Sequence, residues 1–286
     1  MTAETIFRRY SWALALFFAL ILAPAEAFAV KLTEGITYSR GLKLDIHAPD
    51  NAGKRFLFVR TGKLVPVVLY VHGGGWVKGS RKKVYGLPEW LTSRGYILVA
   101  IDYRKVPRTT IDGQVNDVAR AIAWTARNIK RYGGDPDRIV IMGHSAGAHL
   151  VAMAAAQGKA GNIRGVIPND VQAYDIVAYV TKRGTIGPMF GRAFSDNPKN
   201  WVRWSPITYA RRASGLPPHL VMYSRSQGER RRSISIGYAN VLKSRGVRVS
   251  VFHGTKYSHG AIASRLGRPG DSATAAVEKF LRRVMR

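Results

Sequence analysis

Short apolar runs alternate with segments of helical periodicity along most of this 286-residue chain. Several runs, among them VPVVLYVH at 65–72 and YILVAIDY at 96–103, are apolar throughout rather than at every second residue. A strand with that pattern is covered on both faces, as in a parallel sheet flanked by helices. The predicted strands span residues 43–49, 65–72, 96–103, 138–144, 163–168, 218–224 and 247–253.

The segments between these runs fit helices that pack on such a sheet. Residues 112–134 place Val115, Val118 and Ile122 on one stripe, and Gly133 is a natural stop. The other predicted helices span residues 84–95, 146–158, 232–246 and 271–285. The alternation therefore predicts an α/β fold with a mostly parallel sheet, in one domain over residues 30–286.

The stretch 169–217 breaks this rhythm, with four prolines and no clear periodicity. Because a plain loop of about 50 residues is unusual in a compact domain, we interpret it as a cap-like excursion over the carboxyl ends of the strands. Ligands bind at that edge of an open α/β sheet. Its aromatic side chains either line an apolar pocket or pack the excursion onto the sheet. They are Phe190, Phe194, Trp201 and Trp204.

The first 29 residues have the pattern of an export signal. Arg8 and Arg9 precede the apolar stretch 12–23, and small-x-small cleavage sites follow at 25–27 and 27–29. The alternative is a membrane anchor, but twelve apolar residues are short for a bilayer, which needs about 20. We therefore predict cleavage at the end of 1–29 and a periplasmic or extracellular bacterial protein.

Composition excludes some chemistry and leaves the meaning of the charge open. The chain has no cysteine, so disulfides, thiol catalysis and cysteine-bound zinc are excluded. Its net charge is +28, from 45 Lys and Arg against 17 Asp and Glu. No nucleic-acid-binding motif accompanies these basic residues. They either form a solvated surface or give a weak electrostatic association with an anionic envelope surface.

The sequence GHSAG at 143–147 lies between the predicted strand 138–144 and the predicted helix 146–158. A sharp strand-to-helix turn lifts a serine hydroxyl clear of the sheet, and glycines are needed where the turn crowds neighbouring backbone. This context indicates that Ser145 is a nucleophile. The amide of Ala146, at the start of the helix, points outward beside the hydroxyl.

The sequence HGGGW at 72–76 directly follows the predicted strand 65–72. Consecutive glycines let backbone amides approach a ligand oxygen, and attack on an acyl carbon creates an oxyanion that needs such donors. We assign the donors to Gly74, Gly75 and Ala146. The base is assigned to His259, in a loop after the last predicted strand and before the final helix.

These motifs resemble the α/β-hydrolase carboxylesterases of the hormone-sensitive-lipase and feruloyl-esterase-like groups. The resemblance covers residues 35–286 and rests on HGGGW, YGGDPDRI at 132–139, GHSAGAHL at 143–150 and SHG at 258–260. It implies a mostly parallel sheet of about eight strands and ester hydrolysis through an acyl-serine. It implies that the reaction needs no metal and no organic cofactor. It also implies that the partner is a small-molecule ester.

The acid of the triad departs from this resemblance. The family places an aspartate after the strand that corresponds to 218–224, and RSQGERRRS at 225–233 contains none. Glu229 is the carboxylate in that stretch, and we assign it the role of orienting the imidazole. Alternatively, Glu229 pairs with the arginines at 230–232 on the surface. Asp271 and Asp196 are further candidates for the acid of the triad.

The sequence therefore predicts a serine esterase acting on a short acyl or aryl ester. Two alternatives stay open. One is an amidase or aryl-formamidase that uses the same triad, because tryptophan after the three glycines is similar to aryl-formamidases. The other is a catalytically weak hydrolase-like protein that binds anionic envelope components, which the missing aspartate supports.

Overall fold

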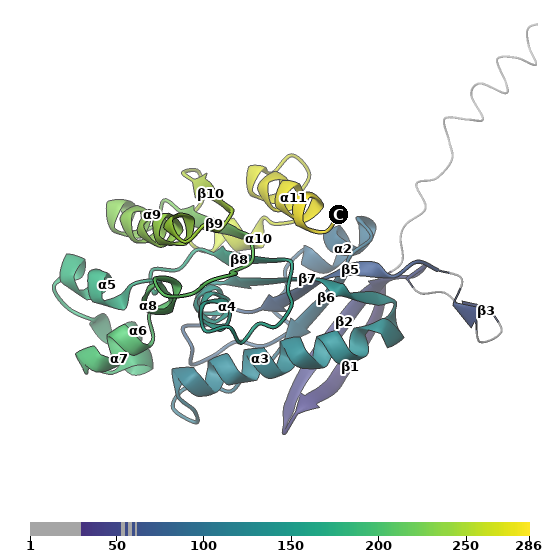
Figure 1. Ribbon diagram of the computed structural model, residues 1–286, viewed down its shortest axis with the longest axis horizontal. Helices are drawn as coiled ribbons and strands as arrows, with labels where there is room; N and C mark the ends of the chain where they lie inside the picture. The colour runs from purple at the N-terminus through teal and green to yellow at the C-terminus, as the bar shows by residue number, and fades with distance from the viewer. Residues whose placement is uncertain (1–29, 53–54, 57–58, 61) are drawn as a thin grey trace, which may run out of the picture.

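The central sheet has eight strands in the order β1-β2-β6-β5-β7-β8-β9-β10 (Figure 1). The computed structural model describes residues 30–52, 55–56, 59–60 and 62–286, so the predicted export signal at 1–29 lies outside the described residues. Strand β2 pairs antiparallel with β1 and β6, and the other neighbours pair in parallel. The predicted mostly parallel sheet of about eight strands is confirmed. Its strands are β1 Val30–Ser39, β2 Leu42–Pro49, β5 Val65–Val71, β6 Ile97–Ile101, β7 Gly134–His144, β8 Gly165–Asn169, β9 His219–Ser224 and β10 Val249–Gly254, and β3 Arg55–Phe56 pairs separately with β4 Val59–Arg60.

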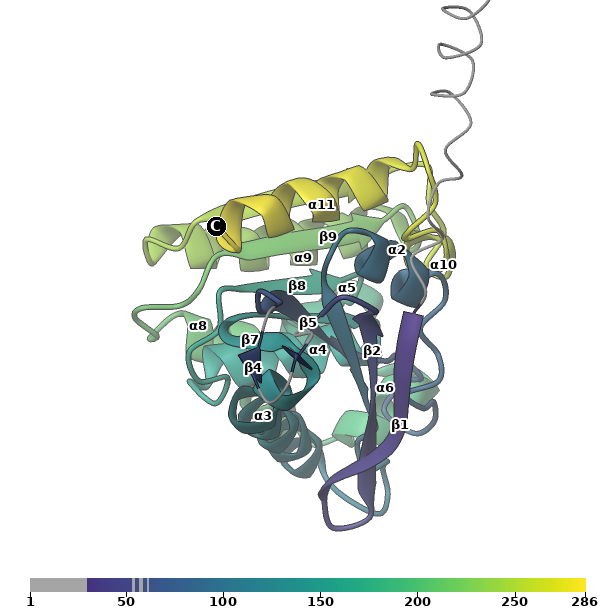
Figure 2. The same cartoon turned by 90° about the vertical axis from the view of Figure 1, so that its right-hand side faces the viewer.

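Helices cover both faces of this sheet (Figure 2). Alternate strand residues point to opposite faces, so Val67 and Leu69 pack in one apolar layer and Val68 and Tyr70 in the other. The first layer includes residues of α3, α4 and α9, and the second includes residues of α2 and α11. Among the described residues, no helix has the length and hydropathy of a membrane span. The helices are α2 Leu87–Ser93, α3 Ile111–Asn128, α4 Ala146–Ala156, α5 Ile176–Arg183, α6 Gly187–Phe194, α7 Pro198–Arg203, α8 Pro206–Ala210, α9 Gly228–Ser244, α10 Ala261–Ser264 and α11 Ser272–Val284, with a 3₁₀ turn η1 at Ile129–Tyr132.

The stretch 169–217 is folded into the four short helices α5 to α8, three of which project at one end of the molecule (Figure 1). These helices have five to eight residues, too few for a repeating apolar stripe to show in the sequence. Phe194 is fully buried and Trp204 nearly so, which means that both pack the excursion onto the domain. Phe190 stacks on Tyr179, with 4.1 Å between ring centroids, and also lines a cavity.

A buried chain of hydrogen bonds ties this excursion to the core. The indole of Trp76, after β5, donates to Nδ1 of His149 on α4 at 3.2 Å. Nε2 of His149 in turn donates to the carbonyl oxygen of Trp204 at 2.7 Å, which assigns the neutral tautomer. The indole of Trp204 donates to Asp112 on α3 at 3.0 Å. Four segments distant in the sequence are thereby held in one arrangement.

Burial makes the fold sensitive to acid. Burial disfavours the charged imidazole and is the main reason why the pKa of four histidines falls from 6.5 to about 4. They are His72, His144, His149 and His219. The unfolded chain therefore binds protons below about pH 6.5 that the folded chain does not bind until about pH 4.

We expect the free energy of unfolding to fall as the pH drops from about 6.5 to about 4, by at most about 1.4 kcal/mol per pH unit for each histidine. Urea unfolding followed by circular dichroism at pH 7, 6 and 5 would measure this fall. An unchanged free energy of unfolding between pH 7 and 5 would contradict it.

Candidate active site

Ser145 occupies a strained turn between the end of β7 and the start of α4. Its backbone angles are φ 56° and ψ −121°, in a region that a residue with a side chain rarely adopts. A Cβ on Gly143 would lie 2.4 Å from the carbonyl carbon of Gly147, and one on Gly147 would lie 2.0 Å from the carbonyl oxygen of Val71. The crowded turn expected from GHSAG is therefore present, and both glycines are needed for it.

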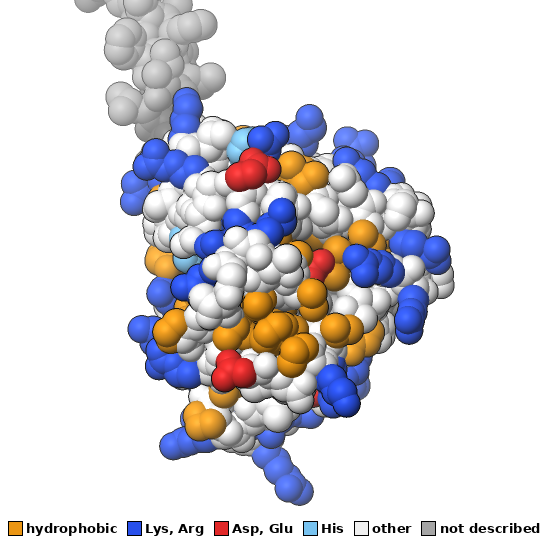
Figure 3. Space-filling model, turned by 90° about the vertical axis from the view of Figure 1, so that its left-hand side faces the viewer, with side chains coloured by type: hydrophobic (Ala, Val, Ile, Leu, Met, Phe, Trp, Pro, Cys, Tyr) orange, Lys and Arg blue, Asp and Glu red, His pale blue; other side chains and the backbone are white. Residues whose placement is uncertain are grey.

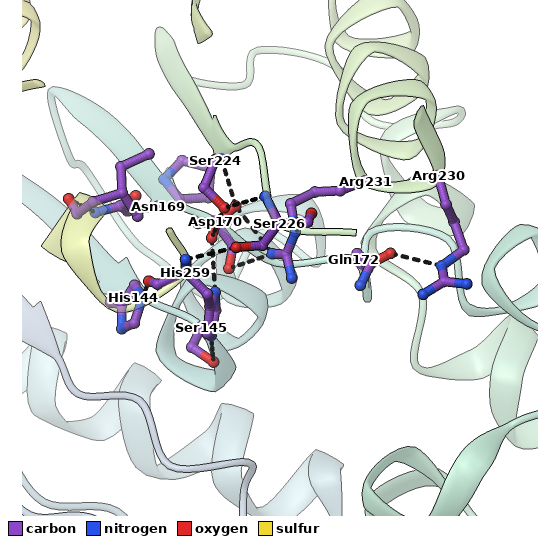
Figure 4. Close-up of polar contacts among 12 residues, drawn as sticks. His144, Ser145, Asn169, Asp170, Gln172, Ser224, Ser226, Arg230, Arg231 and His259 are labelled. Carbon is purple, nitrogen blue, oxygen red and sulfur yellow. Dashed lines mark hydrogen bonds and ion pairs between the residues drawn. The ribbon is translucent and has the colours of Figure 1, made fainter. Parts of the chain in front are cut away.

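His259 lies in the segment between β10 and α10, and its Nε2 is 3.0 Å from the hydroxyl oxygen of Ser145 (Figure 4). Two backbone contacts hold this segment. The amide of His259 donates to the hydroxyl of Ser226 at 2.7 Å. Its carbonyl oxygen accepts a hydrogen bond from Nε2 of His144 at 2.9 Å. The hydrogen bonds of the His259 backbone with Ser226 and His144 thus position the imidazole against Ser145.

The carboxylate that contacts this imidazole belongs to Asp170. Nδ1 of His259 donates to Oδ2 of Asp170 at 2.7 Å. Asp170 is the residue directly after β8, and β8 lies beside β7 in the sheet. Because the two strands are parallel, their carboxyl ends meet at one edge, which brings Asp170 close to the Ser145 turn.

Asp170 is fully buried, yet four groups stabilise its negative charge. Ser224, at the end of β9, donates from its amide to Oδ1 and from its hydroxyl to Oδ2, both at 2.8 Å. The guanidinium of Arg231 is 3.0 Å from Oδ1. Burial alone would raise the pKa of Asp170, but the hydrogen bond from His259 and the charge of Arg231 outweigh it, and the pKa lies below its usual value. Asp170 is therefore ionised at neutral pH.

The glycine loop after β5 reaches the same place, because β5 is the other neighbour of β7. Gly74 has φ +136°, and a Cβ there would lie 2.0 Å from the carbonyl oxygen of Lys78. Within the described residues, the amides of Gly74 and Gly75 donate to no protein acceptor. Ala146 begins α4, so its amide has no acceptor one turn earlier. Gly74 and Gly75 line one cavity together with Ser145 and His259.

Comparison with solved structures places this architecture in a known fold. The chain is similar to an esterase from Pyrobaculum calidifontis, with a TM-score of 0.68 and 23% identity over 100% of this chain and 95% of that chain. It is also similar to a truncated form of a carbohydrate esterase from gut microbiota, with a TM-score of 0.73 and 18% identity over 92% and 99% of the two chains. This chain has the α/β-hydrolase fold.

Sequence comparison finds esterases among the proteins to which this chain is similar. Residues 44–182 match the family model described as BD-FAE. Esterase LipQ of Mycobacterium tuberculosis is 35% identical over 223 residues, which are 71% of this chain and 50% of that protein. The chain spans about half or less of the length of the curated relatives that it matches. The resemblance to α/β-hydrolase carboxylesterases that the motifs indicated is thus confirmed.

Glu229, to which the sequence assigned the acid, does not reach the imidazole. It lies in the first turn of α9 with its side chain 74% exposed, 3.4 Å from Arg232, so the alternative of a surface pair describes it. The end of β9 carries Ser224, whose hydroxyl donates to Asp170. The two other candidates for the acid also lie away from the imidazole: Asp271 caps α11, and Asp196 is exposed.

A sequence signal for Asp170 does exist. The residue lies two positions after the predicted strand 163–168. The prediction did not include Asp170, because the resemblance places the aspartate after 218–224.

His144, Asp170 and His259 offer ligand atoms within 4.8 Å of one another. These atoms are already used in hydrogen bonds, at 2.7 Å between His259 and Asp170 and at 2.9 Å between His144 and the carbonyl oxygen of His259. The carbonyl oxygen can only accept, so Nε2 of His144 carries a proton and is not a ligand in this arrangement. The cluster is therefore built as a chain of hydrogen bonds, not as a metal centre.

Two cavities meet at Ser145 and His259. One, of about 420 Å³, extends under the excursion and includes Trp76, Tyr179 and Phe190 in its lining. The other, of about 500 Å³, extends along the glycine loop. Met189 on α6 lines both cavities. The end of the molecule formed by α5 to α7 shows hydrophobic side chains gathered among lysines and arginines (Figure 3).

Proposed function

We propose that this α/β-hydrolase is a carboxylesterase that cleaves a short acyl or aryl ester through an acyl-serine intermediate. One observation carries the proposal: a continuous chain of hydrogen bonds runs from Asp170 through His259 to the Ser145 hydroxyl, beside backbone amides with no protein acceptor among the described residues. A serine hydroxyl becomes a nucleophile when a base accepts its proton and a third group orients that base.

In the first half of the reaction, Nε2 of His259 takes the proton of Ser145 as the hydroxyl oxygen attacks the ester carbon. The carbonyl oxygen becomes an oxyanion, and the amides of Gly74, Gly75 and Ala146 donate hydrogen bonds to it. The protonated imidazole then gives its proton to the alcohol oxygen, the ester bond breaks, and the acyl group remains on Ser145.

In the second half, a water molecule takes the place of the alcohol. His259 removes a proton from the water as the water oxygen attacks the acyl carbon. The imidazole then returns this proton to the Ser145 oxygen as the acyl–serine bond breaks and the carboxylic acid leaves. Asp170 stays ionised throughout, holds the imidazole in one tautomer and stabilises its positive charge. All of these steps use side chains and amides of this chain, and water.

The relatives support an ester as substrate, since Esterase LipQ and the Pyrobaculum calidifontis esterase are named for that activity. An amidase or aryl-formamidase would use the same groups, and no residue of the site favours amide substrates. The case for a catalytically weak protein rested on the absence of an aspartate after 218–224. Asp170 removes that reason, because a buried, ionised carboxylate is in contact with the imidazole.

We also propose that the protein is exported to the periplasm or the cell exterior of a bacterium and adheres weakly to anionic envelope surfaces. The proposal rests on the arginines and apolar stretch of residues 8–23 and on the net charge of +28. An attraction of this kind is screened by salt, so it weakens as ionic strength rises.

Ser145→Ala is expected to lower kcat for p-nitrophenyl butyrate by at least about 10⁴-fold, because the acyl-serine cannot form. A spectrophotometric assay of the purified protein measures this loss. A fluorophosphonate probe should label the wild type and not the variant. Equal turnover by the two proteins would refute the proposed function.

Asp170→Asn is expected to lower kcat by about 10⁴-fold, because an amide favours the wrong tautomer of His259. Glu229→Gln removes one carboxylate charge as well, and should change kcat by no more than about twofold since its ion pair is exposed. Circular dichroism establishes that both variants fold. A larger loss from Glu229→Gln than from Asp170→Asn would restore the assignment of the acid to Glu229.

Expression of the full chain in a bacterial host tests the export proposal. The protein should appear in the periplasmic or culture fraction, and its amino-terminal sequence should begin between residues 27 and 30. Replacing Arg8 and Arg9 together by glutamate should retain it in the cytoplasm. An intact terminus in the cytoplasmic fraction of the wild type would count against export.

A further inference from the structure

The cavity under the excursion has more positive charge than its carboxylate can balance. Its lining contains three arginines, Arg183, Arg230 and Arg231, and one carboxylate, Asp170. Arg231 is already paired with Asp170 at 3.0 Å. In the described part of the chain, neither Arg183 nor Arg230 forms an ion pair with an acidic side chain.

Arg230 is held in place and is not a freely moving surface side chain. Its Nε donates to Oε1 of the buried Gln172 at 3.0 Å (Figure 4). Its guanidinium lies over the ring of Tyr179, 5.2 Å from the centroid, and also donates to Gln227. Tyr179 is in turn fixed by stacking on Phe190. Neutral partners therefore orient the guanidinium and leave its charge uncompensated.

The surroundings of this guanidinium favour an anion. Arg230 belongs to the first turn of α9, a helix of 17 residues whose amino-terminal end, at Gln227, also lines the cavity. The amino-terminal end of a helix carries partial positive charge. Arg183 adds a second guanidinium to the same lining. A planar guanidinium with free N–H groups matches the geometry of a carboxylate.

We propose that the preferred substrate is an ester with a carboxylate on its acyl or alcohol part, and that Arg230, assisted by Arg183, binds this carboxylate. The inference rests on the proposed esterase function and names its substrate class. Because Ser145, His259 and Arg230 line one cavity of about 420 Å³, a small ester can contact the nucleophile and the guanidinium at once.

The net charge of +28 would by itself attract any anion, so the experiment must separate local binding from general attraction. Arg230→Gln and Arg212→Gln each remove one positive charge. Arg212 is exposed and belongs to neither cavity at the nucleophile, which makes it the matched control. Both variants reduce general attraction equally, and only Arg230→Gln removes the guanidinium from the cavity.

The assay compares kcat/KM for two matched pairs of esters. Mono-p-nitrophenyl glutarate carries a carboxylate on the acyl part and is compared with p-nitrophenyl butyrate. 4-Carboxyphenyl butyrate carries one on the alcohol part and is compared with its neutral methyl ester. We expect the wild type to favour one anionic ester by at least about tenfold, mainly through a lower KM, as for a charged hydrogen bond. Arg230→Gln should abolish this preference and Arg212→Gln should keep it.

Each result has one meaning. If both neutral and anionic esters are left intact by the wild type, the proposed esterase function fails. If neutral esters are cleaved but neither anionic ester is preferred, the esterase function stands and the carboxylate-binding inference is overturned. The same ratio of rates in Arg230→Gln and Arg212→Gln also overturns it. Should Arg230→Gln fail to fold, Arg183→Gln provides the same test, with a partial loss of the preference expected.

Discussion

The close approach of the Ser145 turn to the end of β5 is the contact on which the site depends. Gly147 lies against the carbonyl oxygen of Val71 so closely that a Cβ would sit 2.0 Å from it. This contact lets the first turn of α4 begin beside the glycine loop, which puts the Ala146 amide and the Ser145 hydroxyl at the same edge. A side chain there would separate the Ser145 hydroxyl from the amides that we propose as oxyanion donors.

The second requirement is electrostatic. A buried carboxylate destabilises the folded protein unless positive charges and hydrogen-bond donors surround it. Asp170 meets this cost with contacts from three elements: the amide and hydroxyl of Ser224, the guanidinium of Arg231 and the imidazole of His259. The carboxylate follows β8, yet its donors come from β9, α9 and the segment after β10. Neighbouring elements of the sheet edge therefore supply the donors that let Asp170 stay ionised in contact with the imidazole.

The excursion contributes to the lining of the cavity that contains Ser145 and His259. The hydrogen bonds from Trp76 through His149 to Trp204 hold it on the core, and it supplies Tyr179, Phe190 and Arg183 to the cavity. Aromatic rings and basic side chains are thereby combined in one lining. That combination suits a substrate with an apolar part near the ester bond and a negative charge beyond it.

Much of this molecule is readable in the sequence because local patterns determine it. Continuous apolar runs and alternating patterns predicted seven strands of the sheet, and the small residues of GHSAG and HGGGW located the Ser145 turn and the amide loop. The amino-terminal strand β1 was not predicted, because an edge strand with one exposed face lacks such a run.

The carboxylate that contacts His259 could not be predicted from local patterns. The choice between Asp170 and Glu229 depends on which side chain the packing of β8, β9 and α9 turns inward, and those elements are distant in the sequence. Only the tertiary structure brings their ends together, so only it decided which carboxylate is buried against the imidazole and which is left in water.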